Sequence, residues 1–288
     1  MKNKKRCQAG LAACFGLLLA TVSQAEPYSP SSGFELGQDA QPGTAAIIGS
    51  GESGTDWNDI FDANGQLRPD SGVSQAVFMK DDVSMGTAVD LTALADSDIL
   101  IKNGVVATDQ DIGNVYTALV PDSDDKMAIL GGVERLGDGN GYMTLEFNLD
   151  AVGIGAGGYG QGLPWEMTGS RTEGDIILKL NFANGQLASA EVSRWAGSPD
   201  TGSYQQVGIL SNEGCNEEGT LCALSNDQDI QAGPWLNADP NEDTATIPAH
   251  RFVEFKINAG ALVEQPVYTT VCALTSEDMV FDALKGGN

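Results

Sequence analysis

The feature that most constrains the fold of this chain is an alternation of apolar and polar residues that recurs in short segments. Residues 142–148 (YMTLEFN) place Met143, Leu145 and Phe147 at every second position, with polar residues between them. Because side chains of a β-strand alternate between two faces, this spacing predicts a strand with one buried face. About ten such segments follow one another, at residues 74–80, 114–120, 126–134, 142–148, 175–182, 187–195, 204–210, 251–258, 267–274 and 278–284.

A series of short strands separated by turns predicts an all-β sandwich or barrel. Helical periodicity is weak: residues 90–97 and 258–264 could each form a short helix, and Asn258 could cap the second. Residues 211–250 are polar and lack alternation, so we predict a long polar surface loop there. Function is often found in such loops.

The first 25 residues have the pattern of a secretory signal peptide. Four cations within residues 2–6 precede an apolar run at residues 9–22, and small residues follow up to Ala25. The run is shorter than the ~20 residues of a membrane helix. We therefore expect cleavage near Ala25 and a secreted mature chain, extracellular or periplasmic, without an integral membrane segment. Residues 26–56 are expected to be a flexible leader, and residues 57–288 a single β-sandwich domain.

Acidic residues dominate the charge of the chain. The sequence carries 15 Lys and Arg against 40 Asp and Glu, and loss of the four cations in the signal peptide leaves 11 against 40, a net charge of −29. Such a surface repels nucleic acid and anionic lipid, so nucleic acid is not an expected partner. The charge is typical of an acidic secreted protein in salty surroundings, and calcium binding is the alternative interpretation.

Three cysteines lie in the mature chain, and export permits disulfides. Cys215 and Cys222 enclose a short loop (CNEEGTLC), which makes them the natural local pair and leaves Cys272 as a free thiol. A bridge from either loop cysteine to Cys272 is the alternative, and spacing alone does not decide between them. One histidine and no CxxC motif argue against a zinc site.

The turn-forming residues 138–141 (DGNG) lie between two alternating apolar segments. Asn-Gly favours a β-hairpin because both residues tolerate positive φ. No helix pattern follows, which argues against a phosphate-binding loop, and the further carboxylates of an EF-hand are absent. We therefore predict a hairpin turn in preference to a metal loop.

The chain contains four stretches in the following order: DQDIGNVYTALV, MAILGGVERLGDGNGYMTLEFN, GDIILKLNFANGQLASAEVSRW and RFVEFKINAGAL. In this order they resemble a family of secreted, largely uncharacterised bacterial β-sandwich proteins, over roughly residues 57–284. Glu134-Arg135 stands where that family has Asp-Arg, and Cys272 matches a cysteine strand of the family. The sequence departs from the pattern at Gly185, where the family has two glycines.

The resemblance implies a jelly-roll sandwich that is broadly similar to the carbohydrate-binding modules of secreted enzymes. It provides no established catalytic residues that could be transferred to this sequence. We therefore expect a single all-β sandwich of jelly-roll type, with about ten short strands and one or two short helices.

No motif in the sequence supplies a catalytic nucleophile. His250 is the one histidine and lies at the start of a predicted strand, and no serine lies in a G-x-S-x-G motif between a strand and a helix. A carboxylate pair could hydrolyse a glycoside, but 40 acidic residues leave the pair undefined. We expect a non-catalytic protein, and a secreted hydrolase that uses a carboxylate pair is an alternative.

Calcium (Ca2+) is the cofactor that the acidic loops suggest, because it takes oxygen ligands from loop carboxylates and carbonyls. Asp109 and Asp111 rank first as metal ligands, since they lead into a strand at the acidic motif of the family. Further candidates are Asp122, Asp124, Asp125, Asp239, Asn241 and Asp243. Solvated acidic turns are the alternative for all of them.

Tryptophan side chains are candidate glycan ligands, because an exposed ring can stack on the face of a sugar. Trp165 and Trp235 each follow a proline in a Gly-rich segment and are the predicted ligand-binding residues. Trp195 ends a predicted strand and is expected to pack in the core. We therefore expect the protein to bind a glycan or another cell-surface component. A structural subunit of an extracellular matrix or filament, formed by self-association, is the main alternative.

Overall fold

A computed structural model of the chain describes most of the predicted β-sandwich domain. The described residues are 56–73, 75–80, 100–101, 112–121, 126–154, 165–199, 201–232, 246–263, 268, 270–275, 279–283 and 285–286. The predicted signal peptide and nearly all of the predicted leader lie outside this set.

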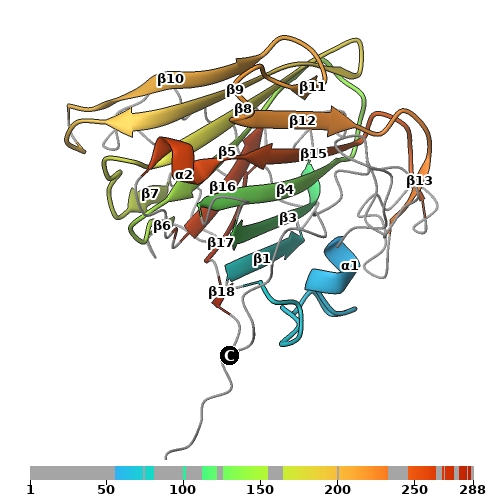
Figure 1. The fold of residues 1–288 in the computed structure, drawn as a ribbon, viewed down its shortest axis with the longest axis horizontal. Coiled ribbons are helices and arrows are strands. Elements are labelled where there is room, and N and C mark those ends of the chain that lie inside the picture. Colours follow the sequence, from blue (N-terminus) through green and yellow to red (C-terminus); the bar gives the residue numbers. More distant parts are fainter. Residues whose placement is uncertain are drawn as a thin grey trace, which may run out of the picture.

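Two antiparallel sheets packed face to face make up most of the described part of the protein (Figure 1). The seven-stranded sheet contains, in spatial order, β11 (Gly214–Cys215), β12 (Leu221–Ser225), β15 (Phe252–Ile257), β4 (Met127–Arg135), β3 (Ile112–Pro121), β1 (Gln75–Lys80) and β18 (Lys285–Gly286). The six-stranded sheet contains, in spatial order, β10 (Ser203–Leu210), β9 (Gln186–Ala196), β8 (Ile176–Ala183), β5 (Gly141–Asn148), β16 (Thr270–Thr275) and β17 (Met279–Ala283). The chain crosses between the sheets after β4, β10, β15 and β17, and the predicted class, an all-β sandwich of jelly-roll type, is confirmed.

Smaller elements complete the described part of the chain. A two-stranded ribbon contains β13 (Ile230–Gln231) and β14 (Thr246–Ile247), and a three-stranded sheet contains, in order, β2 (Leu100–Ile101), β7 (Trp165–Thr168) and β6 (Gly153–Ile154). The two helices are short, α1 (Trp57–Ile60) and α2 (Ala259–Leu262). Asn258 caps α2, as predicted, because its side-chain oxygen accepts a hydrogen bond from Ala261 N at 3.2 Å.

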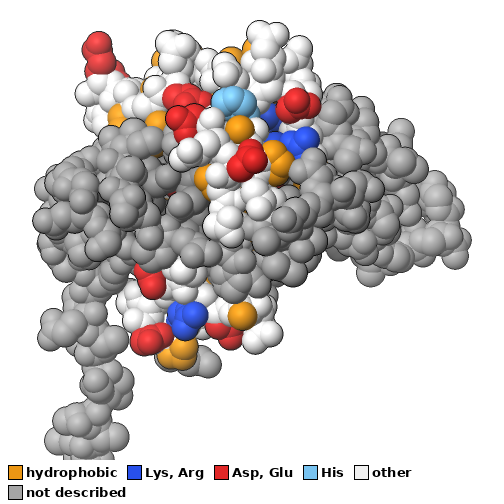
Figure 2. All heavy atoms as spheres, turned by 90° about the vertical axis from the view of Figure 1, so that its right-hand side faces the viewer, with side chains coloured by type: hydrophobic (Ala, Val, Ile, Leu, Met, Phe, Trp, Pro, Cys, Tyr) orange, Lys and Arg blue, Asp and Glu red, His pale blue; other side chains and the backbone are white. Residues whose placement is uncertain are grey.

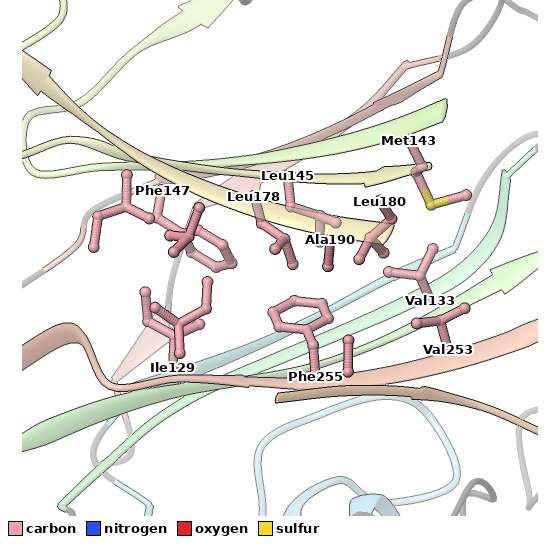
Figure 3. Packing of buried hydrophobic residues seen from close by; sticks show 14 of the residues in the cluster. Ile129, Val133, Met143, Leu145, Phe147, Leu178, Leu180, Ala190, Val253 and Phe255 are labelled. Carbon is pink, nitrogen blue, oxygen red and sulfur yellow. The ribbon is translucent and has the colours of Figure 1, made fainter. Parts of the chain in front are cut away.

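The main core lies between the inner faces of the two sheets (Figure 3). Met143, Leu145 and Phe147 point into it, as the alternation predicted, and each is at most 1% exposed. Phe147 meets Phe255 of the opposite sheet edge to face, with ring centroids 6.4 Å apart. Gly131 leaves room for this ring, since a Cβ atom there would lie 1.9 Å from Phe255 Cζ. Side chains of the two sheets therefore pack closely against each other in the core.

A second cluster covers the outer face of the seven-stranded sheet. Trp57 and Phe61, from α1 and its end, are buried there together with Tyr116 and Phe252 of the sheet. The ring centroids of Trp57 and Tyr116 are 5.5 Å apart, and those of Tyr116 and Phe252 are 6.0 Å apart. The short apolar stretch before the first strand thus covers a second hydrophobic core.

All ten predicted strands are present, with their ends shifted by a few residues. Two longer strands, β7 and β12, were not predicted. The predicted long loop at residues 211–250 is wrong where β12 lies, since its five residues (LCALS) are all buried. A strand that is covered on both faces reads as a continuous apolar run and therefore shows no alternation.

Residues 138–141 do not form the predicted hairpin, because β4 belongs to one sheet and β5 to the other. The turn carries the chain between the sheets, and Arg135 holds it: Nη2 donates to the Gly139 carbonyl oxygen at 2.6 Å and Nη1 to that of Gly185 at 3.2 Å. The Asn-Gly hairpin is instead Asn184-Gly185 between β8 and β9, where φ is 52° and 80°. Alternation on both sides of a turn marks two strands without specifying the partner of either.

Candidate functional site

Polar side chains cover part of the outer face of the six-stranded sheet, and we call this group the outer platform. Because Leu178, Leu180 and Val192 turn inward to the core, the residues between them turn outward. The outer platform comprises Tyr142, Lys179, Asn181, Ser189, Glu191, Ser193 and Gln206. All of these residues are at least partly exposed. Most of them lie on β8, β9 and β10, which form the upper side of the molecule in Figure 1.

Contacts within the outer platform hold its side chains in place. Lys179 Nζ lies 4.3 Å from the centre of the Tyr142 ring, a cation–π contact. Asn181 Nδ2 donates a hydrogen bond to Ser189 Oγ at 3.0 Å. Glu191 lies opposite Lys179 in the register of β8 and β9. The platform therefore offers an aromatic ring, an amide, hydroxyl groups and both signs of charge on rigid strands.

One end of the same face is closed by a buried ion pair. Arg171 Nε donates to Glu146 Oε1 at 2.7 Å, and both residues are 2% exposed. The Tyr204 hydroxyl also donates to Glu146 Oε1. The guanidinium carbon of Arg171 lies 5.1 Å from the ring centres of both Trp195 and Tyr204. The loop before β8 thus seals this end with a charge pair that is enclosed by two aromatic rings.

Burial changes the proton affinity of two groups at the closed end. It raises the pKa of Tyr204 well above its usual value, and the Glu146 carboxylate adds to the effect. Burial also raises the pKa of Asp175 to about 6, although its carboxylate accepts hydrogen bonds from Leu149 N at 2.8 Å and Thr172 N at 2.7 Å. Asp175 therefore holds the loop that positions Arg171, and it does so with a carboxylate that titrates near neutral pH.

Two carboxylates on the outer face of the seven-stranded sheet are the structural candidates for a hydrolytic pair. Glu254 Oε1 accepts a hydrogen bond from Trp57 Nε1 at 2.7 Å, and Glu134 Oε2 accepts one from Asn114 Nδ2 at 2.9 Å. Both glutamates are 0% exposed. Burial, with the Glu134 charge as the next cause, raises the pKa of neighbouring Tyr116 well above its usual value. In this conformation these carboxylates belong to a closed interior and are out of reach of a substrate.

The predicted disulfide is formed. Cys215 and Cys222 are bonded and lie directly opposite each other in the pairing of β11 with β12. Cys272 lies on β16, opposite Glu146 of β5, and its side chain is outside the described residues. The disulfide thus ties the outermost short strand of the seven-stranded sheet to its neighbour.

The other predicted site residues fall mostly outside the described part of the chain. This holds for Trp235, Asp109 and Asp111, and the structure gives only the backbone of Trp165, which begins β7. Trp195 is 3% exposed, which confirms its predicted packing role. His250 lies in a turn, with φ of 66°. The further metal-ligand candidates lie outside the described residues: Asp122, Asp124, Asp125, Asp239, Asn241 and Asp243.

Sequence reasoning missed the pairing of Glu146 with Arg171. The alternation places Glu146 on the polar face of its strand and gives no partner for it. The two residues lie 25 positions apart, and Tyr204 is a further 33 positions along the chain. One signal was visible: an arginine in a Gly-rich loop of a chain with few cations. Its partner depended on the strand order of the sheet, which the alternation does not contain.

Fold and site define the class of this protein as a two-layer antiparallel β-sandwich with one covered and one partly open outer face. Comparison of the chain with protein-family models, with curated proteins and with solved structures finds no match. The resemblance to secreted β-sandwich proteins therefore stays a prediction from sequence motifs. In the described residues, no group of three or more His, Cys, Asp or Glu side chains is arranged to hold a metal ion. The described helices are also too short or too polar to cross a membrane.

Proposed function

We propose that the protein is an exported, acidic, non-catalytic β-sandwich protein that binds a glycan or another surface ligand through its outer platform. The observation that supports this function is an open sheet face on which Tyr142, Asn181 and Ser189 lie on adjacent strands in fixed register. Sugars offer hydroxyl groups to amides and hydroxyls, and an apolar ring face to an aromatic side chain. A site on strands, with its side chains held by mutual contacts, is preorganised for such a ligand.

Binding fits the described side chains better than hydrolysis does. A glycosidase needs two carboxyl groups that flank the bond to be broken, with both reaching the substrate. Glu134 and Glu254 are enclosed by their own hydrogen-bond donors, and Glu146 is paired with Arg171. Glu191 is the carboxylate on the outer platform, and its neighbour in register is Lys179. These contacts favour a structural role for the three buried glutamates, and we propose that Glu191 helps to orient the ligand.

The net charge of the chain limits the class of glycan that it could bind. A protein with 40 acidic residues against 15 basic ones repels polyanions, so we propose a neutral or cationic glycan. Trp165 and Trp235 remain proposed ligand contacts from the sequence, and calcium at Asp109 and Asp111 remains a proposed cofactor. The proposal for the outer platform depends on neither.

The test is binding of purified mature protein to a panel of neutral, cationic and anionic polysaccharides, measured by affinity electrophoresis and calorimetry. Tyr142→Ala and Lys179→Ala should each weaken binding of the preferred glycan about tenfold, a loss of about 1.4 kcal/mol. Lys256→Ala on the other sheet is the matched control and should leave affinity unchanged. Absence of binding to every polysaccharide, or an equal loss in all three variants, would refute the assignment of the platform.

A further inference from the structure

The strand β10 lies at one edge of the six-stranded sheet and carries no charged residue. It is the last strand of the six-stranded sheet, so one of its backbone edges has no neighbouring strand among the described residues. Residues 201–212 (TGSYQQVGILSN) contain no Asp, Glu, Lys or Arg, in a chain that has 55 of them. Edge strands of soluble proteins are usually protected by charged side chains, particularly lysine. This edge lacks that protection.

The same strand carries the exposed apolar side chains. In the described part of the chain, the large hydrophobic residues that are exposed are Val207, at 38%, and Ile209, at 51%. Both lie on β10, two positions apart, at the upper margin of the molecule in Figure 1. Figure 2 shows, for comparison, a side of the molecule where acidic, basic and apolar groups are interspersed. Two apolar side chains on an uncharged edge are therefore a local feature of β10.

We propose that β10 pairs in antiparallel fashion with β10 of a second copy of this chain. Electrostatics favours a second copy as the partner. Two chains of net charge −25 repel each other over most of their surfaces, and they can approach most easily where the surface is uncharged, as it is along β10. A basic partner would instead be drawn to the acidic surface. Main-chain hydrogen bonds between the two edges supply affinity, and Val207 and Ile209 lose exposed area on pairing. The result is one continuous sheet across two molecules.

A β-bulge limits the strength of this contact. The register of β10 against β9 shifts between Gln206 and Gly208, and a bulge bends and twists the strand that contains it. Regular pairing is then confined to a few residues on each side of the bulge. The association is therefore weak and reversible, and it strengthens with salt, which screens the repulsion between the two acidic chains.

The experiment is sedimentation velocity of the mature chain over a concentration series up to about 1 mM. The wild-type protein should show a reversible monomer–dimer equilibrium that shifts towards dimer in sodium chloride. The double variant Val207→Lys, Ile209→Lys should raise the dimer dissociation constant at least tenfold. The control Gln186→Lys, Ala188→Lys introduces the same charge at two exposed positions of β9 and should not weaken the dimer. Both variants reduce net charge, so general electrostatics alone would strengthen association in each.

Hydrogen exchange at low and high protein concentration locates the contact. Backbone amides of β10 should become more protected as the concentration rises, while those of β1 in the other sheet should not change. If thermal unfolding shows that the lysine variant is not folded, Ile209→Thr, which keeps the branched shape, should still raise the dissociation constant several-fold. A monomer at every concentration, equal association of the β10 and β9 variants, or added protection on a different strand would each overturn the proposal. None of these readouts depends on glycan binding.

Discussion

The two sheets of this sandwich differ in how far their outer faces are covered by other segments. On the seven-stranded sheet, Tyr116 and Phe252 are 0% exposed, because α1 with its buried Trp57 and the segments that carry β13 and β14 cover them. On the six-stranded sheet, residues such as Lys179 and Ser193 are partly exposed on strands of the same regularity. The covered face is a second core and adds stability. The open face leaves ordered side chains available for a ligand.

The exposure of carboxylates also differs between the two outer faces. Glu254 on the covered face has its hydrogen bond from Trp57 and no exposed area, whereas Glu191 on the open face is partly exposed. A buried carboxylate is costly unless it is hydrogen-bonded or paired, so its surroundings are set by the fold. Substitution of buried Glu254 should therefore change stability, whereas substitution of Glu191 tests the binding that we propose for the outer platform.

The largest expected effect is that of Trp57→Ala on the covered face. The change removes a large buried ring from the sheet and takes away the indole donor of Glu254, so the free energy of unfolding should fall by about 4 kcal/mol. Urea denaturation measures it. Tyr142→Ala on the open face is the control and should cost less than about 1 kcal/mol. Equal losses would show that the two faces do not differ in the way described.

A smaller loss is expected for Arg171→Met at the closed end of the open face. The variant leaves the Glu146 carboxylate buried without its ion-pair partner, and should lower the free energy of unfolding by about 3 kcal/mol. Adding Glu146→Gln should recover part of this loss, because the uncompensated charge is removed. Lys179→Met on the outer platform should change stability little. If the double variant is no more stable than the single one, the ion pair is not the source of the effect.

An effect of about 1.4 kcal/mol between pH 8 and pH 5 is expected from Asp175. Its pKa in the folded protein is raised to about 6, so between pH 4 and 6 the folded state binds more protons than the unfolded state. Its contribution to stability is therefore least above pH 7 and grows as the pH falls through 6. Asp175→Asn does not titrate, so the wild type should gain stability relative to this variant from pH 8 to pH 5. A pH-independent difference between the two melting curves would contradict the raised pKa.

The smallest expected effect concerns Asp109 and Asp111, which lie outside the described residues. If they hold calcium, millimolar calcium should raise the melting temperature more than magnesium does, because an ion that binds only the folded state stabilises it. Asp109→Asn with Asp111→Asn should remove most of the difference between the two ions. Sodium chloride at matched ionic strength controls for general screening. A rise that sodium chloride reproduces in full would assign the effect to the acidic surface as a whole.

Local pattern was sufficient to predict the strands of this protein. All ten predicted strands are present because period-2 alternation is a direct consequence of strand geometry. The Cys215–Cys222 bond was predicted from proximity in the sequence, and the cap at Asn258 from its residue type and position. One unpredicted strand, β12, has a clear physical reason. β12 is buried on both faces, so its sequence has no alternation to detect.

The amino-acid sequence by itself determined most of the segments that become strands, which face of each of these strands is apolar, and the acidic net charge. Tertiary structure alone decided that β4 and β5 lie in different sheets, that Glu146 meets Arg171 and Tyr204, and that one outer face is covered while the other is partly open. The physical reason is the separation in sequence over which each kind of interaction acts. Alternation and turn residues act between neighbours in the chain, whereas strand order and burial of a polar face are set by contacts between segments far apart in sequence.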